Sequence, residues 1–518
     1  MYIRKILASG CLAVVALAAP AIHPAFESRD ELKPQGKIDL LVFARWKQLG
    51  IQPANLCSDA VFLRRVYLDA IGTLPTAKEA SEFLASREPA KRAALVDRLL
   101  DREEFADYWA MKWSDLLRVK AEFPINLWPN AAQAYYHWIR AAIHENRPYD
   151  RFVREMLTAS GSNFRDAPVN FYRAMQNHDP PGIAQSVALT FMGARAEKWP
   201  AARQAEMAAF FSRVEFKHTG EWKEEIVYFD PAKKGASAIT KFPDGTPAKL
   251  APGQDPREAF ADWLIAPGNP WFARAIANRA WSWLLGRGIV HEPDDIRPDN
   301  PPENPELLAL LESEVRDSHY DLKHLFRLIL TSSAYQVSPI PQGDRNTAAQ
   351  HFAAYPLRRL DAEVLIDALN QITGTGETYS SSIPEPYTFM PDDQRSIALP
   401  DGSISSSFLE LFGRPPRDTG TEAERNNRIT DAQKLHMLNS SQVQRKIQQG
   451  PKLVAMMRDI KDPRELVNQL YLSILSRYPT DEEWKAMAAH AQGGVRGQPA
   501  VVDLVWALLN SAEFLYRH

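Results

Sequence analysis

Acidic, basic and amide side chains gather in one short stretch near the middle of the chain. They lie on a helical pattern that stops at Gly286 and in the proline-rich segment 292–302 that follows it. Carboxylates and guanidinium groups this close together could hold a hard cation or a polar ligand, or supply an acid for catalysis. The members of this first polar cluster are Asn278, Arg279, Asp294, Asp295, Arg297, Asp299 and Asn300.

A structural role competes with these chemical roles. Acidic and arginine side chains in a proline-rich turn usually tie the turn to helix ends through charge-assisted hydrogen bonds. Asp294 and Asp295 are adjacent in an extended turn, so their side chains point to different sides, which argues against a shared proton. We therefore expect the cluster to be structural, and we keep a ligand or Ca²⁺ site and a catalytic role as alternatives.

Common catalytic motifs are missing from the chain. There is no Gly-x-Ser-x-Gly, no His-Glu-x-x-His and no Gly-x-x-x-x-Gly-Lys, which are the patterns of a hydrolase nucleophile, a zinc hydrolase and a phosphate loop. The 12 histidines are scattered along the chain. The sequence therefore shows no assembled nucleophile, base and orienting group.

Four helical segments between residues 255 and 336 must position the first polar cluster. The pairs Asp255-Pro256, Asn269-Pro270 and Asn304-Pro305 each place an N-cap side chain before a proline at the first helical position. Asp321 caps the fourth segment, whose apolar residues recur with the period of a helix and predict one buried face. The second segment is apolar on more than one side, so we expect it at the centre.

This part of the chain resembles a known family. The segments NRAWSWLLGRGIVHEPDDIRPDNPPENPELLALLESEV and YDLKHLFRLILTSSAYQ are similar to the planctomycete-specific domain of unknown function. That domain usually follows a planctomycete cytochrome-associated domain, which resembles the segments RRVYLDAIGTLPT, RPYDRFVREMLTASGSNF and FMGARAEKWPAARQAEMAAFF. The resemblance covers nearly everything from about residue 40 onward, and it implies no settled activity.

The resemblance also points to cysteines that this chain lacks. Many relatives of the first domain carry Cys-x-x-Cys-His after Phe-x-Gly, a pattern suited to covalent haem or a metal. Here Phe191-Met192-Gly193 is followed by residues 194–199, which read ARAEKW. Relatives of the second domain commonly carry Cys-x-Cys-x-Arg where residues 421–425 read TEAER. We therefore expect no haem and no metal in this chain.

The charged residues around the second of these positions form a second polar cluster. The resemblance implies that cysteine-bearing relatives place ligands here, and only the ionic part is present in this chain. The members of the second polar cluster are Arg414, Arg417, Glu424 and Arg425.

The predicted fold class is mainly α and multi-helical, with two helical domains joined by a small β element. Arg4 and Lys5 precede an apolar run that ends at a small-residue cleavage site, so residues 1–21 are predicted to be a signal peptide; a retained anchor or lipidation are the alternatives. The remaining segments are a leader (22–36), a first helical domain (37–212), a β element with β-prone runs at 224–229 and 238–242 (213–254), and a second helical domain (255–518) with a long loop at 373–407.

Two further patterns concern the helices. Residues 67–105 and 471–514 share an order of Tyr-Leu, Pro-Thr, Glu, two apolar pairs and Glu-Phe, which indicates either a repeated helical hairpin or convergence on a common capped pattern. Residues 105–140 are rich in tryptophan and tyrosine, and we expect these rings in the core rather than at a ligand platform.

Composition limits the choice of partners. With 45% hydrophobic and 24% charged residues, the chain is typical of a globular protein. It has 64 acidic against 61 basic residues and no clustered basic face, so we expect no nucleic-acid partner. Only Cys57 remains after signal cleavage, so no internal disulfide can form. No later segment approaches the roughly 20 apolar residues of a membrane span.

We expect a periplasmic or secreted protein that binds or scaffolds at the cell envelope, with a protein or an envelope polymer as its partner. The alternative is an extracytoplasmic hydrolase that acts on a polysaccharide or similar polymer, with Asp294 or Asp295 as the acid. Electron transfer through a non-covalent cofactor is a third hypothesis. Two carboxyl groups about 5–10 Å apart across an open cleft would favour the hydrolase, and carboxylates neutralised by Arg279 and Arg297 would favour the scaffold.

Overall fold

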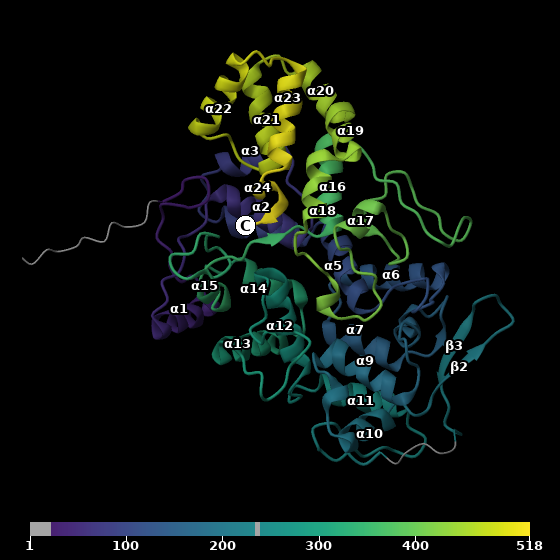
Figure 1. Ribbon diagram of the computed structural model, residues 1–518. Helices are drawn as coiled ribbons and strands as arrows, with labels where there is room; N and C mark the ends of the chain where they lie inside the picture. The colour runs from purple at the N-terminus through teal and green to yellow at the C-terminus, as the bar shows by residue number, and fades with distance from the viewer. Residues whose placement is uncertain (1–21, 234–238) are drawn as a thin grey trace, which may run out of the picture.

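Helices dominate the computed structural model, which describes residues 22–233 and 239–518, and the strands form only small sheets (Figure 1). The prediction of a mainly α, multi-helical fold is confirmed. The predicted signal peptide, residues 1–21, lies outside the described residues. Within the two described ranges, no helix is both long enough and apolar enough to cross a membrane.

The first part of the chain is a series of helices with short connections. They are α1 (Lys37–Leu49), α2 (Asp59–Ala70), α3 (Ala77–Ala85), α4 (Lys91–Leu100), α5 (Glu103–Leu116), α6 (Pro129–His144), α7 (Tyr149–Thr158), η1 (Ala167–Val169), α8 (Asn170–Arg173), α9 (Pro180–Met192), η2 (Ala196–Lys198) and α10 (Ala201–Ala209). The close contacts of α5 with α6 and of α9 with α10 organise this part into helical pairs.

The second part is also helical. It contains α11 (Pro256–Ile265), α12 (Phe272–Leu285), α13 (Pro305–Asp317), α14 (Leu322–Leu330), α15 (Arg345–Gln350), α16 (Ala362–Thr373), η3 (Ser396–Ala398), α17 (Ser407–Leu411), η4 (Glu422–Glu424), α18 (Asp431–Asn439), α19 (Ser441–Gln449), α20 (Pro451–Asp459), α21 (Pro463–Leu475), α22 (Asp481–Gln492), α23 (Gln498–Leu509) and α24 (Ala512–Leu515). Figure 1 shows α21, α22 and α23 at one end of the molecule and α10 and α11 at the other.

Two small antiparallel sheets complete the fold. In the first, β3 (Glu225–Phe229) lies between β1 (Gly161–Ser162) and β2 (Val214–His218). In the second, β4 (Arg358–Arg359) pairs with β5 (Tyr516–Arg517). The strand predicted at 224–229 is therefore present as β3. Of the other predicted run, Ala238 lies outside the described residues, and the rest forms only a bridge from Lys241 to Pro247.

Side-chain caps set most of the helix starts around the first polar cluster. Asp255, Asn304 and Asp321 cap α11, α13 and α14 as predicted. The predicted start of α12 at Pro270 is wrong by two residues. Asn269 Oδ1 accepts hydrogen bonds from the backbone N–H groups of Trp271 and Phe272, at 3.0 and 3.1 Å, so the chain makes a turn before the helix begins.

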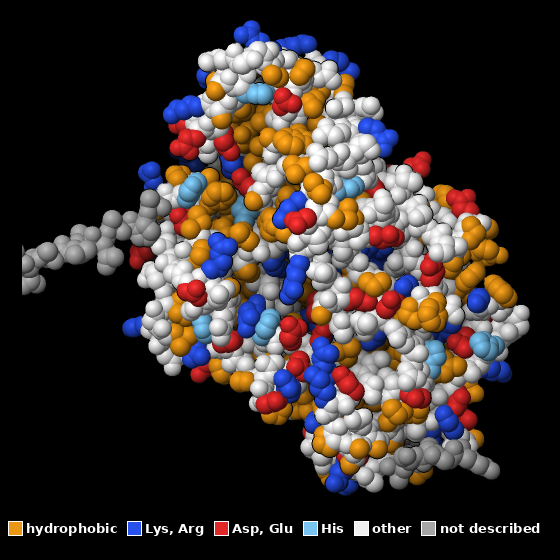
Figure 2. All heavy atoms as spheres, viewed as in Figure 1, with side chains coloured by type: hydrophobic (Ala, Val, Ile, Leu, Met, Phe, Trp, Pro, Cys, Tyr) orange, Lys and Arg blue, Asp and Glu red, His pale blue; other side chains and the backbone are white. Residues whose placement is uncertain are grey.

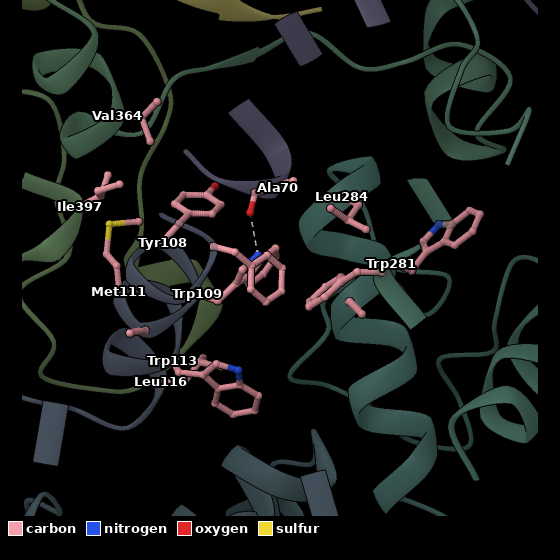
Figure 3. Packing of buried hydrophobic residues seen from close by; sticks show 14 of the residues in the cluster. Ala70, Tyr108, Trp109, Met111, Trp113, Leu116, Trp281, Leu284, Val364 and Ile397 are labelled. Atoms are coloured by element: carbon pink, nitrogen blue, oxygen red, sulfur yellow. Dashed lines mark hydrogen bonds between the residues drawn. The ribbon is translucent and has the colours of Figure 1, made fainter. Parts of the chain in front are cut away.

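One hydrophobic core joins the two parts of the chain. Trp109 of α5 stacks on Phe326 of α14 with ring centroids 4.3 Å apart, and it lies 5.1 Å from Trp283 of α12. Its indole N–H donates to the backbone oxygen of Ala70 at 3.0 Å, as Figure 3 shows. Helices from both parts therefore pack aromatic side chains against each other.

The C-terminal residues enter this core beside α2. Arg64 and Arg65 of α2 are almost fully buried. Arg64 donates to the backbone oxygens of Ile474 and Phe514 at 2.7 and 2.9 Å, and Arg65 donates to that of His518 at 2.8 Å. Buried arginines need such acceptors, so α2 and the C-terminal segment depend on each other.

The two segments that share a sequence pattern also share a local structure. In each, a threonine and a glutamate form a capping box, at Thr76 and Glu79 in α3 and at Thr480 and Glu483 in α22. In each segment an arginine forms ion pairs both with that glutamate and with a second glutamate. Arg102 pairs with Glu79 and Glu104, and Arg477 pairs with Glu483 and Glu513. The two arginines come from different places in their segments, so the likeness lies in the acidic pair and the capped helix.

Candidate functional site

Arg279 and Asp294 form a buried ion pair at the centre of the first polar cluster. Arg279 lies on α12, Asp294 lies in the turn between α12 and α13, and their exposed fractions are 1% and 2%. Arg279 Nη2 donates to Asp294 Oδ1 at 2.8 Å, and Nη1 donates to the backbone oxygen of Thr190 at 2.7 Å. The pair therefore ties the proline-rich turn to the C-terminal end of α9, where a cation is favoured.

Glu422, which the sequence did not single out, completes this arrangement. Its backbone N–H donates to Asp294 Oδ2 at 2.8 Å, and its carboxylate accepts a hydrogen bond from Trp283 Nε1 at 2.6 Å. Its Oε1 also lies 3.7 Å from Arg279 Nε. Burial, followed by the nearby Asp294 carboxylate, raises the pKa of Glu422 to about 7. Two carboxyl groups thus share one guanidinium group here.

The outer members of the first polar cluster are more exposed. Arg297 Nε lies 3.2 Å from Asp295 and Nη1 lies 3.3 Å from Asp299, while Lys198 lies 3.6 Å from Asp295. Asn300 Nδ2 donates to the backbone oxygens of His291 and Asp295 and closes the turn. These residues hold the turn in shape, and within the described part of the chain no hydrogen bond or ion pair of their side chains reaches Arg279 or Asp294.

Asn278 has a separate role. Its side chain accepts from the backbone N–H of Val290 at 2.8 Å and donates to the backbone oxygen of the same residue at 3.0 Å. This pair of hydrogen bonds fixes the chain just after α12. The seven predicted residues therefore divide into a buried ion pair, an exposed turn and a backbone clamp, and they do not make one site.

Three of the four members of the second polar cluster meet around two buried carboxylates. Asp115 accepts from Arg417 Nε at 2.9 Å and from Arg425 Nη2 at 2.6 Å. Glu363 accepts from Arg425 Nη1 at 2.7 Å, and Arg414 Nε lies 3.5 Å away. Burial opposes ionisation of Glu363, but Arg425 lowers its pKa to about 2.

Glu424, the fourth member, lies outside this group. Its carboxylate accepts from the backbone N–H groups of Asp418 and Thr419, at 2.8 and 3.3 Å, and closes a loop. Further ion pairs are formed instead by Asp361, Lys112 and Arg517, which sequence reasoning missed. Asp361 accepts from Lys112 at 2.9 Å and from Arg517 at 2.8 Å. Only the three-dimensional fold brings these residues together, because each comes from a different element.

The two segments for which the resemblance implies cysteine motifs in relatives both contact the turn after α12. The backbone N–H of Ile296 donates to the oxygen of Gly193 at 2.8 Å, and Glu422 contacts Asp294 as described above. The one cysteine in the described residues, Cys57, is buried elsewhere beside Arg92. The side chains present at the turn therefore do not fit a covalent haem or a metal held by thiolates. Nor does the described part of the chain contain three or more His, Cys, Asp or Glu residues grouped as metal ligands.

A further group of aromatic rings, exposed or partly exposed, shares no residue with the two polar clusters. Trp128 precedes α6, Trp222 lies in the loop between β2 and β3, and Tyr387 lies in the long loop after α16. The ring centroid of Trp128 is 5.4 Å from that of Tyr387 and 6.4 Å from that of Trp222. Phe123 and Phe389 lie on two of the same loops and are 86% and 65% exposed. Trp128, Trp222 and Tyr387 are called the aromatic patch.

The aromatic patch qualifies the prediction that the tryptophans and tyrosines of residues 105–140 lie in the core. Trp109, Trp113, Tyr135 and Tyr136 are buried, and Trp138 is half-buried and packs against the core. Trp128 is partly exposed, because it stands at the start of α6 facing the loop that carries Trp222. The signal that could have separated Trp128 from the others is its position before Pro129, which marks a helix start.

The fold and the polar clusters together define a multi-helical protein in which most of the predicted charged groups form hydrogen bonds and ion pairs with other parts of the same chain. The model of PSCyt2, a protein of unknown function (DUF1549), matches residues 37–215, and that of PSD1, a protein of unknown function (DUF1553), matches residues 256–491. The chain belongs to the proteins that carry these two domains in this order, so the resemblance to the planctomycete domains is confirmed. No curated protein and no solved structure matches the chain.

Proposed function

We propose that this chain is an exported binding or scaffold protein of the cell envelope that works without haem or a bound metal, and that the aromatic patch is its contact surface. The observation that carries the proposal is the contrast between the polar clusters and the patch. Asp294 is 2% exposed with both oxygens hydrogen-bonded, whereas Trp222 is 68% exposed. Exposed aromatic side chains grouped together are a common mark of interaction surfaces.

Export is supported by the charged start, apolar run and small-residue site in residues 1–21. The absence of cofactor chemistry is supported by the replacement of both cysteine motifs and by the carboxylates and arginines that stand at the turn after α12. A periplasmic or secreted location follows from the same N-terminal segment.

A test uses the tagged full chain incubated with envelope fractions of its native host. We expect the chain to retain envelope material, Trp222→Ala to lose most of that retention, and Tyr478→Ala, which alters a 46% exposed ring on a distant segment, to keep it. Equal retention by the Trp222→Ala variant would contradict the proposed contact surface. Iron, zinc or a bound chromophore at full occupancy in protein from the native host would contradict the cofactor-free role.

A hydrolase acting on a polysaccharide is the second candidate, and one observation favours it. The carboxyl group of Glu422 lies beside Asp294 and has a pKa raised to about 7, which suits an acid or a base. Asp294 is nearly inaccessible, whereas the side chain of Glu422 is 25% exposed. Release of reducing ends from envelope polysaccharide that is lost in Glu422→Gln would support this candidate over the binding role.

A further inference from the structure

A groove with a volume of about 480 Å³ lies between α3 and α4 and shares no residue with the polar clusters or the aromatic patch. Small-molecule sites commonly have volumes of about 300–1,000 Å³. The apolar part of its lining includes Tyr67, Phe83, Leu95 and Leu99, all at most 5% exposed. Figure 1 places α3 beside α21, and Figure 2 shows acidic and basic side chains together on this edge of the molecule.

The two capped hairpins, residues 67–105 and 471–514, show which groove residues the hairpin structure itself requires. Tyr67 and Glu79 correspond to Tyr471 and Glu483, and the Leu-Leu pair of α4 corresponds to that of α23. These shared residues serve the common structure. Other groove residues differ, because Glu82, Lys91 and Arg98 of the first hairpin correspond to Ala486, Ala500 and Ala507 of the second.

In the second hairpin a hydrogen bond crosses the corresponding space between the helices. His490 Nε2 of α22 lies 3.1 Å from Asp503 Oδ2 of α23. In the first hairpin the corresponding residues are Ser86 and Ala94, which both line the groove. Their side chains are too short to make such a bridge. The open groove therefore arises from the choice of residues, because the hairpin framework is the same in both places.

Two cations that line the groove are bound to other parts of the chain. Arg102 Nη1 lies 2.8 Å from Glu79 Oε1, and Lys91 Nζ lies 2.7 Å from Asp59. Lys91 also donates to the backbone oxygen of Ser86 at 2.9 Å. These contacts hold α3 and α4 to each other and to α2. The groove is therefore formed before any ligand arrives, which lowers the entropic cost of binding.

Other charged groups of the groove remain available. Within the described part of the chain, the side chains of Arg98 and Glu88 form no ion pair, and both residues are exposed. The side chain of Glu82 is 65% exposed, and its nearest cation, Lys78, is 3.9 Å away. Arg98 stands on α4 and Glu82 stands on α3. The two helices that line the groove therefore present available charges of opposite sign.

A short peptide fits these features. Its carboxylate can pair with the guanidinium group of Arg98, its ammonium group can pair with Glu82 or Glu88, and an apolar side chain can cover Phe83 and Leu95. Acidic and basic residues line the groove in equal number, so its charge favours neither a polyanion nor a polycation. We propose that this groove binds a short peptide with free ends and an apolar side chain, as a second binding site that is independent of the aromatic patch.

Titration calorimetry with the purified full chain tests this assignment. The probes are leucyl-phenylalanine, the same dipeptide with acetylated and amidated ends, and glycyl-glycine. We expect leucyl-phenylalanine to bind, and Arg98→Gln to bind it about tenfold more weakly, as the loss of one charge-assisted hydrogen bond predicts. The capped dipeptide and glycyl-glycine should also bind more weakly. Arg151→Gln, which changes an exposed arginine of α7, should bind like the wild type.

A second variant closes the groove with the bridge of the other hairpin. Ser86→His combined with Ala94→Asp should abolish binding of leucyl-phenylalanine and leave the melting temperature close to that of the wild type, because the changed side chains lie on the surface of the same framework. The matched control, His490→Ser combined with Asp503→Ala, removes the natural bridge and should keep binding unchanged. If the first variant does not fold, Arg98→Gln decides the test.

Several outcomes would overturn this inference. They are no binding of leucyl-phenylalanine, equal binding of the capped dipeptide, or unchanged binding in the folded variant with the closed groove. Binding of glucose or of phosphatidylethanolamine vesicles in place of the dipeptide would assign the groove to a different ligand. Loss of dipeptide binding in Trp222→Ala would place the peptide at the aromatic patch. Envelope retention that depends on Trp222 tests the proposed function separately, so either result can fail without the other.

Discussion

At the scale of single residues, the fold sorts its charged groups by burial. Arg279 and Asp294 are buried and bound to each other, whereas Arg297 and Asp299, only a few residues along the turn, have side chains that are 46% and 74% exposed. Removing one partner of a buried ion pair strongly destabilises the folded protein, because the other charge stays in a low-dielectric interior. An exposed ion pair contributes little to stability. Residues of the same type in one turn therefore contribute differently to stability, depending on how deeply they are buried.

The three aspartates of this turn give a graded prediction. Asp294→Asn should lower the free energy of unfolding by about 3 kcal/mol, because the buried charge of Arg279 then has only the more distant carboxyl group of Glu422, 3.7 Å away. Asp299→Asn should cost less than about 1 kcal/mol because its pair with Arg297 is exposed, and Asp295→Ala should fall between them. Urea unfolding monitored by circular dichroism measures all three. Equal costs for Asp294→Asn and Asp299→Asn would contradict a structural role for the buried pair.

Glu422 gives a prediction about pH. Its pKa is raised to about 7 by burial and by Asp294, although Arg279 and Lys112 act in the opposite direction. In the unfolded chain the group loses its proton near its usual value of about 4.3. Between about pH 4.5 and 7 the folded chain holds more protons, so this group makes stability fall as pH rises, and its effect levels off above 7.

Glu422→Gln removes this titration, and the histidines are common to both proteins. The stability of the wild type relative to Glu422→Gln should therefore decrease from pH 5 to pH 7 and then stay constant to pH 8. Urea unfolding at each pH gives the difference. Two curves that run parallel over this range would show that Glu422 keeps an ordinary pKa in the folded protein.

The composition of the polar clusters could be predicted from the sequence only in part. Arg279 and Asp294 stand in a helix and a turn close together in the chain, and local charge patterns indicate their pairing. Glu422 reaches the same place from 128 residues away, and Asp115 and Glu363 neutralise arginines that follow them by far in the chain. Long-range ion pairs leave no spacing signal, because tertiary packing alone determines them.

At the scale of elements, caps were the most informative signal and short strands the least. Asp255, Asn304 and Asp321 begin helices where proline and capping rules place them. Arg358 and Arg359, by contrast, form β4 with the last residues of the chain just before α16 begins at Ala362. A two-residue strand carries no periodicity, so no local pattern could have predicted it.

The two capped hairpins allow a matched comparison of ion-pair strength. Arg477→Ala should lower the free energy of unfolding by about 3 kcal/mol, because it leaves Glu483 and Glu513 close together without their shared cation. Arg102→Ala should cost about 1 kcal/mol, since that side chain is 32% exposed against 9% for Arg477. Thermal melting compares the two directly. A larger loss for Arg102→Ala would show that exposure does not determine the strength of these pairs.

At the scale of the whole molecule, the segments matched by the PSCyt2 and PSD1 models share their interior. Trp109 packs between Phe326 and Trp283, and Asp361 of the second segment binds Lys112 of the first. Sequence patterns place a boundary near the β element, and the helices on each side have their own apolar faces. The patterns do not tell which faces meet, because every buried helix face has the same period.

A division of the chain at the β element should therefore give no stable first half. A fragment of residues 22–254 would lose the backbone oxygens of Ile474, Phe514 and His518 that Arg64 and Arg65 bind. It would also expose Trp109, which packs on Phe326 and Trp283 of the second segment, and each large apolar side chain that loses its burial costs about 1.5–3 kcal/mol, against total stabilities of about 5–15 kcal/mol. Near-ultraviolet circular dichroism and calorimetry should show no cooperative melting for the fragment alone, and co-expression with residues 255–518 should restore it. A sharp transition in the isolated fragment would mean that its core is complete without the second segment.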